Sequence, residues 1–355
     1  MAIIHGSPAV LIQKSGSGNS VIVLVEDGAT VTATSSAATV TGVSSGGSVT
    51  LAIPQAGTYT ISASKNGVTT PDVKVIEIPQ SVSLSFVTAD FDSNSWDLIS
   101  ATVAAGQAAN YWSVGDTKAV ALSGTVGTLA LNATYYVYIL GFNHNGATNT
   151  MDIGMFKTAK TSGIDVCLCD STYGSYSSAT TAFHMNTSDS NSGGWNKSAM
   201  RYYILGSTNI QNGNATSDCT VNPVKNSLMA ALPEDLRAVL KPMTIYSDNT
   251  DGGSNTASYV TTTVDYLPLL SEYEVQGTRS YANSAEQNHQ AQYQYYKNGN
   301  SKIKYKHNGT STAAYWWLRS VFATDSDFFC YVRTGGSANG NGASVCCGVA
   351  PIFCV

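Results

Sequence analysis

Over the first eighty residues, short β-branched runs alternate with turns rich in Gly and Ser. In residues 30–34 and 58–64, apolar and polar side chains alternate with a period of two. That period places successive side chains on opposite faces of a strand. Asn66-Gly67 predicts a tight hairpin turn, because both residue types adopt positive φ readily. Residues 1–80 are therefore predicted to form an all-β antiparallel sandwich.

Part of this segment, residues 56–67 (AGTYTISASKNG), resembles the late hairpin of bacterial immunoglobulin-like modules. The resemblance implies an immunoglobulin-like sandwich for residues 1–80. No catalytic motif or cluster of metal ligands stands out within it. We therefore expect this domain to serve as an attachment or spacer module.

From about residue 83 the chain becomes rich in aromatic residues, and its pattern changes with them. The run Tyr135–Phe142 is aromatic and β-branched, which predicts a strand. Val114–Asp116 is expected to form a turn that leads into another strand around Ala119–Leu122. Residues 83–355 are therefore treated as a second domain.

Helical patterns concentrate in the middle of the chain. Apolar spacing predicts a helix over 222–231, and Pro233 followed by two acidic residues predicts a second helix through Leu240. Ser271–Glu274 has the sequence of a capping box. A polar helix is expected over 284–296, ended by the following Asn-Gly pair. Residues 247–262 are expected to form an exposed loop.

Charge is sparse, which limits the classes of partner. Only 12% of the residues are charged, about half the usual share for a globular protein, and the formal net charge is −5. Neither value favours nucleic acid or an acidic membrane surface. No apolar run approaches the ~18 residues of a membrane helix. The first residues lack the features of a Sec signal. We expect synthesis in the cytoplasm without a Sec signal, no nucleic-acid partner and no membrane insertion.

The cysteines argue against a disulfide framework. There are seven, an odd number without a CxxC pair, and Cys346 and Cys347 are adjacent. Cys167 and Cys169 are spaced too closely for a usual zinc knuckle. This usage predicts a protein that folds with free thiols in a reducing compartment, without a structural disulfide or metal.

Catalytic motifs are missing from the sequence. The five histidines are scattered, and no nucleophile-elbow, zinc-protease, Walker or dinucleotide-binding motif occurs. Asp248, Asp251 and Asp265 could in principle bind a cation. Because turn-forming residues surround them without EF-hand spacing, we interpret them as solvated loop carboxylates. Asn143–Gly146 is interpreted as a turn that ends a strand. We expect no enzymatic activity and no cofactor.

Two adjacent tryptophans, Trp316 and Trp317, mark the start of the last segment. On a strand they point to opposite faces, so one can fill a core while the other covers a second layer. Arg319 has two interpretations. It could bind a ligand through cation–π or carboxylate contacts, or it could be a core arginine held by a carboxylate and an aromatic stack. We favour the core interpretation.

Residues 321–355 have an unusual composition. They contain no Lys, Glu, Gln, Met or Trp, although all five types occur earlier in the chain. Those are the residues that a codon ending in a pyrimidine cannot encode. The segment also mixes Phe, Asp, Tyr, Arg and Cys over a regular apolar skeleton. A Gly/Asn-rich terminal hairpin of chance composition is the alternative. We favour a fixed scaffold with substituted exposed positions.

The run YWWLRS, FFCYV and GVAPIFCV resembles the variable proteins of diversity-generating retroelements found in gut phages and bacteria. Shorter matches begin at Ser95, Trp112, Gly141, Gly194 and Leu232, so the resemblance spans residues 83–355. It implies an α+β C-type-lectin-like (formylglycine-generating-enzyme-like) domain with a hypervariable region at about 315–355. Template asparagine codons mutated at adenine would leave the composition described above. Position 321, a proline in some members, is valine here.

The resemblance also assigns roles to individual residues. The implied ligand-binding, variable positions are Phe322, Thr324, Asp325, Asp327, Phe328, Tyr331, Arg333, Thr334, Gly335, Ser337, Val345, Cys346, Cys347 and Ile352. The implied scaffold residues are Trp316, Trp317, Arg319, Phe329, Val332 and Phe353. A cysteine-based active site of the related enzymes cannot be placed on this sequence, so activity does not carry over.

These expectations describe a receptor-binding protein on a phage tail or a bacterial cell surface, an adhesin that recognises a host or bacterial cell-surface protein or glycan. Its first domain would attach to virion or tail components, and a homo-oligomer is compatible with the sequence. Two alternatives remain open. One is an enzyme on the formylglycine-generating-enzyme-like fold, and the other is a purely structural fibre protein.

Overall fold

A computed structural model describes residues 10–11, 20–54, 58–70, 72–75, 80–83, 85–170, 183–211, 214–215, 218–250 and 255–355. The chain divides into two compact units, residues 1–112 and 113–355. The domain limits expected at 80 and 83 stay a prediction. The described chain is mixed in class, with mostly β-sheet and few helices, all of them short.

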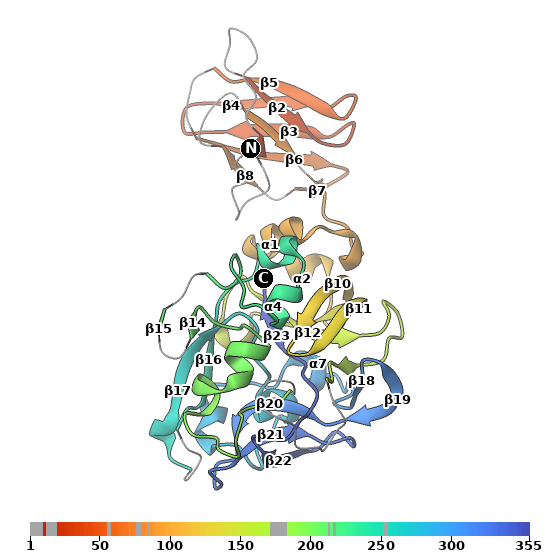
Figure 1. Cartoon of the computed structure of the whole chain (residues 1–355). Coiled ribbons are helices and arrows are strands. Elements are labelled where there is room, and N and C mark those ends of the chain that lie inside the picture. Colours follow the sequence, from red (N-terminus) through yellow and green to blue (C-terminus); the bar gives the residue numbers. More distant parts are fainter. Residues whose placement is uncertain are drawn as a thin grey trace. The chain divides into compact units, whose positions relative to one another are not determined.

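Two sheets of the first unit pack around one core. The first has the strand order β1 (Val10–Leu11), β9 (Gln80–Ser83), β2 (Ser20–Leu24) and β5 (Ser48–Ala52). The second consists of β4 (Thr39–Val43), β3 (Thr30–Thr34), β6 (Tyr59–Lys65) and β7 (Val68–Thr69), with β8 (Val73–Val75) also paired to β6. Val23 from one sheet and Ile61 from the other belong to the same buried cluster. The two sheets thus form a sandwich, as the alternation predicts (Figure 1).

The turn expected at Asn66-Gly67 is confirmed. The φ angles are +52° and +82°, and the turn joins β6 to β7. Beyond the sandwich, this unit holds a short 3-10 turn, η1 (Phe91–Ser93), and two helices, α1 (Trp96–Ala104) and α2 (Ala108–Tyr111). Ser95 caps α1 by accepting a hydrogen bond from the Leu98 N–H.

The largest sheet of the second unit has the order β10 (Thr117–Val126), β11 (Leu129–Phe142), β12 (Met151–Lys157) and β23 (Ile352–Cys354). β11 includes the strand predicted over Tyr135–Phe142, and β10 includes the one around Ala119–Leu122. Both predictions are confirmed, as are the turn at Val114-Gly115 and the strand-ending turn, η2 (His144–Gly146). All neighbours in this sheet run antiparallel.

Smaller sheets complete the described second unit. They are β13 (Val166–Cys167), β18 (Lys304–Lys306) and β19 (Gly309–Ala314); β14 (Ile210–Gln211) and β15 (Asn214–Ala215); β16 (Met243–Asp248) and β17 (Val260–Asp265); and β20 (Trp316–Val321), β21 (Phe328–Val332) and β22 (Ala338–Gly342). β16 and β17 include residues 247–248 and 260–262 of the exposed loop expected over 247–262, so that prediction is wrong for both flanks of the segment.

The helices are shorter than the sequence predicts. They are α3 (Gly194–Lys197), the π-helix η3 (Met200–Ile204), α4 (Leu228–Ala231), α5 (Glu234–Arg237), η4 (Ala257–Tyr259), α6 (Glu272–Gln276), η5 (Ser284–Asn288) and α7 (Gln294–Lys297). Of the helix expected over 222–231, only the last turn forms, as α4. The predicted capping box at Ser271–Glu274 is confirmed at the start of α6.

The prediction of one helix over 284–296 is wrong, because non-helical residues separate η5 from α7. Gln290 lies between the two helices, and its side chain is buried. It accepts a hydrogen bond from the Ser271 hydroxyl at 2.6 Å and donates one to the Tyr246 carbonyl at 2.8 Å. These long-range bonds replace the local ones that a continuous helix would make.

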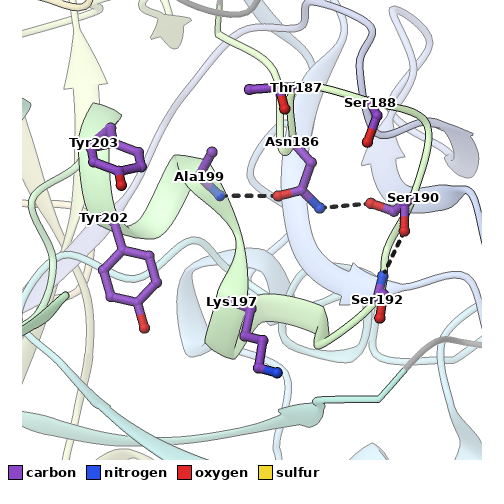
Figure 2. Close-up of a pocket in the computed structure, with 9 residues that line it drawn as sticks. All are labelled: Asn186, Thr187, Ser188, Ser190, Ser192, Lys197, Ala199, Tyr202 and Tyr203. Carbon is purple, nitrogen blue, oxygen red and sulfur yellow. Dashed lines mark hydrogen bonds between the residues drawn. The ribbon is translucent and has the colours of Figure 1, made fainter. Parts of the chain in front are cut away.

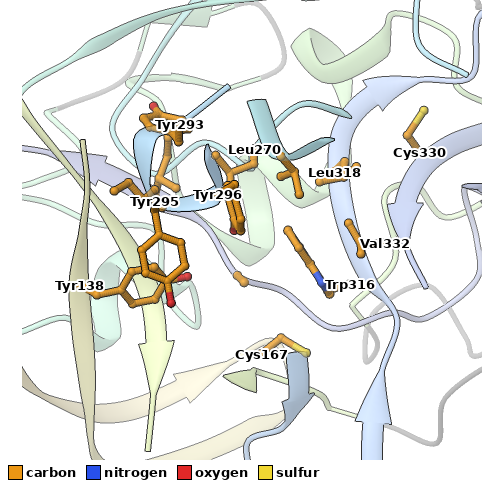
Figure 3. Close-up of a cluster of buried hydrophobic side chains, with 14 of the residues drawn as sticks. Tyr138, Cys167, Leu270, Tyr293, Tyr295, Tyr296, Trp316, Leu318, Cys330 and Val332 are labelled. Atoms are coloured by element: carbon orange, nitrogen blue, oxygen red, sulfur yellow. The ribbon is translucent and has the colours of Figure 1, made fainter. Parts of the chain in front are cut away.

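Aromatic residues fill the core beneath the last sheet. Trp316, Leu318, Cys330 and Val332 point from β20 and β21 into a cluster that also contains Tyr295 (Figure 3). Tyr138 of β11 packs against Tyr295, with ring centroids 4.5 Å apart. The core therefore joins the last sheet to the largest one. Among the residues that the structure describes, no helix is long and apolar enough to cross a membrane.

Candidate functional site

The last sheet begins with two anchored tryptophans. Trp316 and Trp317 are fully buried on opposite faces of β20. The Trp316 indole donates a hydrogen bond to the Lys302 carbonyl at 3.0 Å, and the Trp317 indole donates one to the Phe183 carbonyl at 2.9 Å. Each ring is therefore both packed and hydrogen-bonded, which fixes its orientation.

Arg319 of β20 forms a buried ion pair with Glu274 of α6. Its two terminal nitrogens donate to the two carboxylate oxygens at 2.6 and 2.7 Å. Burial acts to raise the pKa of Glu274, but the charge and hydrogen bonds of Arg319 outweigh it and lower that pKa. The interpretation of Arg319 as a core arginine held by a carboxylate is confirmed. No aromatic stack on Arg319 is recorded among the described contacts.

A second buried carboxylate supports the same strand. Glu286 of η5 accepts hydrogen bonds from the Ser320 hydroxyl at 2.6 Å and from the Asp248 backbone N–H at 3.0 Å. Burial raises the pKa of Glu286 to about 7 despite these donors. Two buried acidic side chains therefore bond to β20. The pKa of Glu274 is lowered, whereas the pKa of Glu286 is raised.

Asp248 and Asp265 are fully buried, so the interpretation of both as solvated loop carboxylates is wrong. Asp265 accepts from the Arg201 Nε at 2.7 Å and from the hydroxyls of Ser207 and Thr263. Asp248 accepts from the Asn283 amide at 2.8 Å. Asp251 lies outside the described residues. Asn283, Ser207 and Arg201 are 35, 58 and 64 residues away in sequence from the aspartates that they bond, which explains why local composition misled the prediction.

The predicted variable positions differ in exposure. Thr324, Asp327, Arg333, Thr334, Gly335 and Ser337 are exposed, and Phe322, Asp325 and Phe328 are half-buried. Five positions are buried, so the expected surface exposure is wrong for them: Tyr331, Val345, Cys346, Cys347 and Ile352. Ile352 lies in β23 inside the main core, and Tyr331 packs against Tyr315 and Trp317. The predicted scaffold residues Trp316, Trp317, Arg319, Phe329, Val332 and Phe353 are all buried.

The accessible positions form two groups at opposite ends of β21. The first group, here called the loop patch, is residues 322–328, which connect β20 to β21 and include the first residue of β21. The second, the turn patch, is residues 333–337, between β21 and β22. Phe322 and Phe328 meet edge to face within the loop patch, with centroids 6.1 Å apart. In the turn patch the Arg333 N–H donates to the Ser337 carbonyl at 2.8 Å.

Asn191 fixes the loop patch from outside the last segment. Its fully buried side-chain amide donates to the carbonyls of Asp325 at 2.6 Å and Phe328 at 2.9 Å. Nearby, Asp189 accepts from the hydroxyl of Ser344 at 2.7 Å. Sequence reasoning missed both residues, because Asn and Asp in a Ser-rich stretch look like ordinary turn formers. The adjacent Gly194-Trp195 motif was the only signal for this segment.

A polar pocket of about 320 Å³ adjoins the same segment (Figure 2). The Asn186 side chain spans part of it, accepting from the Ala199 N–H at 3.0 Å and donating to the Ser190 carbonyl at 2.6 Å. The backbone N–H groups of Met185 and Asn186 both donate to the Ala343 carbonyl. The pocket is lined by the methyl group of Ala199 and by hydroxyl, amide, amine and phenol groups from Asn186, Thr187, Ser188, Ser190, Ser192, Lys197, Tyr202 and Tyr203.

Within the described parts of the chain, no group of three or more His, Cys, Asp or Glu side chains is arranged to hold a metal ion. Cys167, Cys169 and His307 lie near one another.

A family described as a domain of unknown function (DUF6273) matches residues 173–355, which include the last sheet and both patches. No curated protein and no solved structure matches the chain.

Proposed function

The chain belongs to the DUF6273 family, and we propose that it is a non-enzymatic ligand-binding protein that contacts its ligand through the loop and turn patches. The observation that carries this proposal is the composition of residues 321–355, which lack Lys, Glu, Gln, Met and Trp. Adenine-directed mutation of asparagine codons would produce that bias. The proposal includes diversification by a retroelement and a C-type-lectin-like fold for the second domain.

The arrangement of the last sheet supports a variable surface on a fixed scaffold. β20 is buried along its whole length and is held by Glu274 and Glu286. The patches at either end of β21 carry most of their side chains on the surface. Substitution there removes few native contacts, so many sequences can share one fold. Arg333 belongs to a residue type that often dominates binding energy, and Phe322 and Phe328 belong to a type that is enriched at the centre of interfaces.

The ligand class proposed is a cell-surface protein or glycan, with the protein on a phage tail or a bacterial surface. The first domain would then act as an immunoglobulin-like module that attaches the chain to virion or tail components. The net charge of −5 supports a ligand other than nucleic acid.

The diversification part of the proposal is tested on the gene. We expect a near-identical template copy of the codons for about 315–355 close to the gene, together with a reverse transcriptase. Mismatches between copy and gene should coincide with adenines of the template. A genomic neighbourhood without such a copy overturns the diversification.

The binding part is tested with the full chain on a glycan array and on intact bacterial cells. Once a binding target is found, Phe328→Ala and Arg333→Ala should each weaken binding by tenfold or more, on the order of a hot-spot residue. Lys225→Ala, which removes an exposed basic residue outside both patches, is the matched control. Retained binding by both patch variants contradicts the assignment of the surface.

A further inference from the structure

Two thiols lie side by side at the end of β13. Cys167 and Cys169 are separated by Leu168, whose backbone exchanges two hydrogen bonds with Val349 at 3.0 and 2.9 Å. That extended backbone places both cysteine side chains on one face. Their Sγ atoms are 3.8 Å apart, close enough for one thiol to donate to the other.

The two thiols differ in their access to solvent. All seven cysteines lie in described parts of the chain, and none of them is part of a disulfide. Six are buried, whereas Cys169 is half-buried and reaches the surface. Cys167 is fully enclosed and belongs to the aromatic core (Figure 3). A reagent in water can therefore approach Cys169 but not its neighbour.

A basic strand edge lies against the pair. The His307 Nδ1 accepts a hydrogen bond from the Cys169 backbone N–H at 3.1 Å, and the His307 backbone N–H donates to the Cys167 carbonyl at 3.1 Å. Lys306, the preceding residue, adds a positive charge near the same thiol.

The two thiols consequently ionise at different pH values. Burial raises the pKa of Cys167 well above its usual range, so this group stays a protonated donor. The hydrogen bond from Cys167, aided by His307 and Lys306, lowers the pKa of Cys169 to about 6, although partial burial opposes this shift. The arrangement provides a nucleophile with its own hydrogen-bond donor.

We propose that Cys169 is a modification site that undergoes thiol–disulfide exchange with small soluble disulfides. The Cys169 thiolate attacks one sulfur of the disulfide, a new S–S bond forms, and the old S–S bond breaks. The second sulfur leaves as a thiolate with the electron pair of the broken bond. The product is a mixed disulfide at the protein surface. The site is separate from the loop and turn patches and is independent of the proposed ligand.

The full-length chain with the chromophoric disulfide 5,5′-dithiobis(2-nitrobenzoate) provides the test. We expect the native chain to release one equivalent of coloured thiolate on the order of tenfold or more faster than the remaining equivalents, because buried thiols are inert. Peptide mapping should place the adduct on Cys169, and Cys169→Ser should remove the fast phase. First modification of any other cysteine overturns the proposal.

The pH dependence of the fast phase tests the environment of the thiol. Among the described residues, the titratable groups that face it are Cys167, His307, Lys306, Asp170 and Cys347. Burial raises the pKa of Asp170 to about 6, in the same range, so Asp170→Asn separates the two groups. The midpoint should stay near 6 in that variant. A midpoint near the ordinary thiol value of about 8.5 in the unmodified chain overturns the proposal.

Variants at the donor complete the design. Cys167→Ala should move the midpoint upward by removing the S–H donor, whereas Cys167→Ser keeps a donor and should hold it low. Cys354→Ala, a buried thiol of the large sheet, is the matched control and should leave the midpoint unchanged. If Cys167→Ala does not fold, His307→Ala should still raise the midpoint. An unchanged midpoint in both Cys167→Ala and His307→Ala overturns the proposed activation.

Discussion

β20 and the patches at the ends of β21 are adjacent in sequence, yet they are held in very different ways. Every residue of β20 is buried, and side chains from α6 and η5 bond to it. The loop patch is fixed mainly through its backbone, by the Asn191 amide. Bonds to a backbone do not depend on the side chain that the backbone carries. The difference shows how one segment can keep its path while its surface changes.

The largest expected effect comes from breaking the ion pair beneath β20. Glu274→Ala leaves the Arg319 guanidinium buried without its carboxylate, which should cost about 3–5 kcal/mol of unfolding free energy. Chemical denaturation followed by tryptophan fluorescence measures the loss. The matched control is Glu26→Ala, which breaks the exposed pair with Lys65 and should cost less than about 1 kcal/mol. Equal losses in the two variants would contradict the contrast.

Tyr331 of β21 tests the difference between buried scaffold residues and exposed variable positions. It was assigned to the variable surface, but only 5% of it is exposed, and it packs against Tyr315 and Trp317. Tyr331→Ala should therefore cost about 3 kcal/mol, as for other buried aromatic residues. The measurement is the shift in denaturation midpoint. A change below about 0.5 kcal/mol would return Tyr331 to the exposed set.

Glu286 makes the support of β20 depend on pH. Its pKa is about 7 in the folded chain and near 4.5 when unfolded. The folded state therefore binds more protons in this window, and its contribution to stability is lost as pH rises from about 4.5 through about 7. Against Glu286→Gln, the native chain should lose on the order of 1–3 kcal/mol between pH 5 and pH 8.

The comparison with Glu286→Gln is needed because His144 acts in the opposite direction. Burial lowers the pKa of His144 to about 4, so stability from this group is lost as pH falls below about 6.5. Both chains share this contribution, and it cancels in the difference. A difference that does not vary with pH would show that Glu286 is ionised throughout.

The smallest effect is expected in the turn patch. Thr334→Ala removes an exposed side chain whose neighbours bond through their backbone. The free energy of unfolding should change by less than about 0.5 kcal/mol. Thermal unfolding of this variant alongside Tyr331→Ala gives the contrast within one sheet. A loss above about 1 kcal/mol would place Thr334 with the scaffold instead.

Features that depend on neighbours in sequence were predictable. The Asn66-Gly67 turn, the Ser271–Glu274 capping box and the strand Tyr135–Phe142 all follow from local rules, and all three are present. Asp265 is different, because its burial depends on Arg201, 64 residues away. No local sequence pattern predicts such a distant partner.

The same limit applies to the candidate site. The composition of residues 321–355 identified an unusual segment, and the pattern of buried scaffold residues agrees with the one inferred. The sequence pattern did not distinguish Tyr331 and Ile352 from the exposed positions. The alternation of buried and exposed side chains is lost where a strand is buried on both faces. The roles of Asn191 and Asp189 also depend on contacts more than 130 residues apart.

The pairing of β23 with β12 has a consequence for how the chain folds. Asp152 pairs with Cys354, so the largest sheet is completed only by a contact between residues about two hundred positions apart. Contacts of such long range make folding slow, because loop closure precedes the gain in packing. The hairpins of the first unit close over a few residues and can form while synthesis continues. The second unit must wait until its last strand has left the ribosome, and a chaperone that shields its aromatic core during that interval should raise the folded yield.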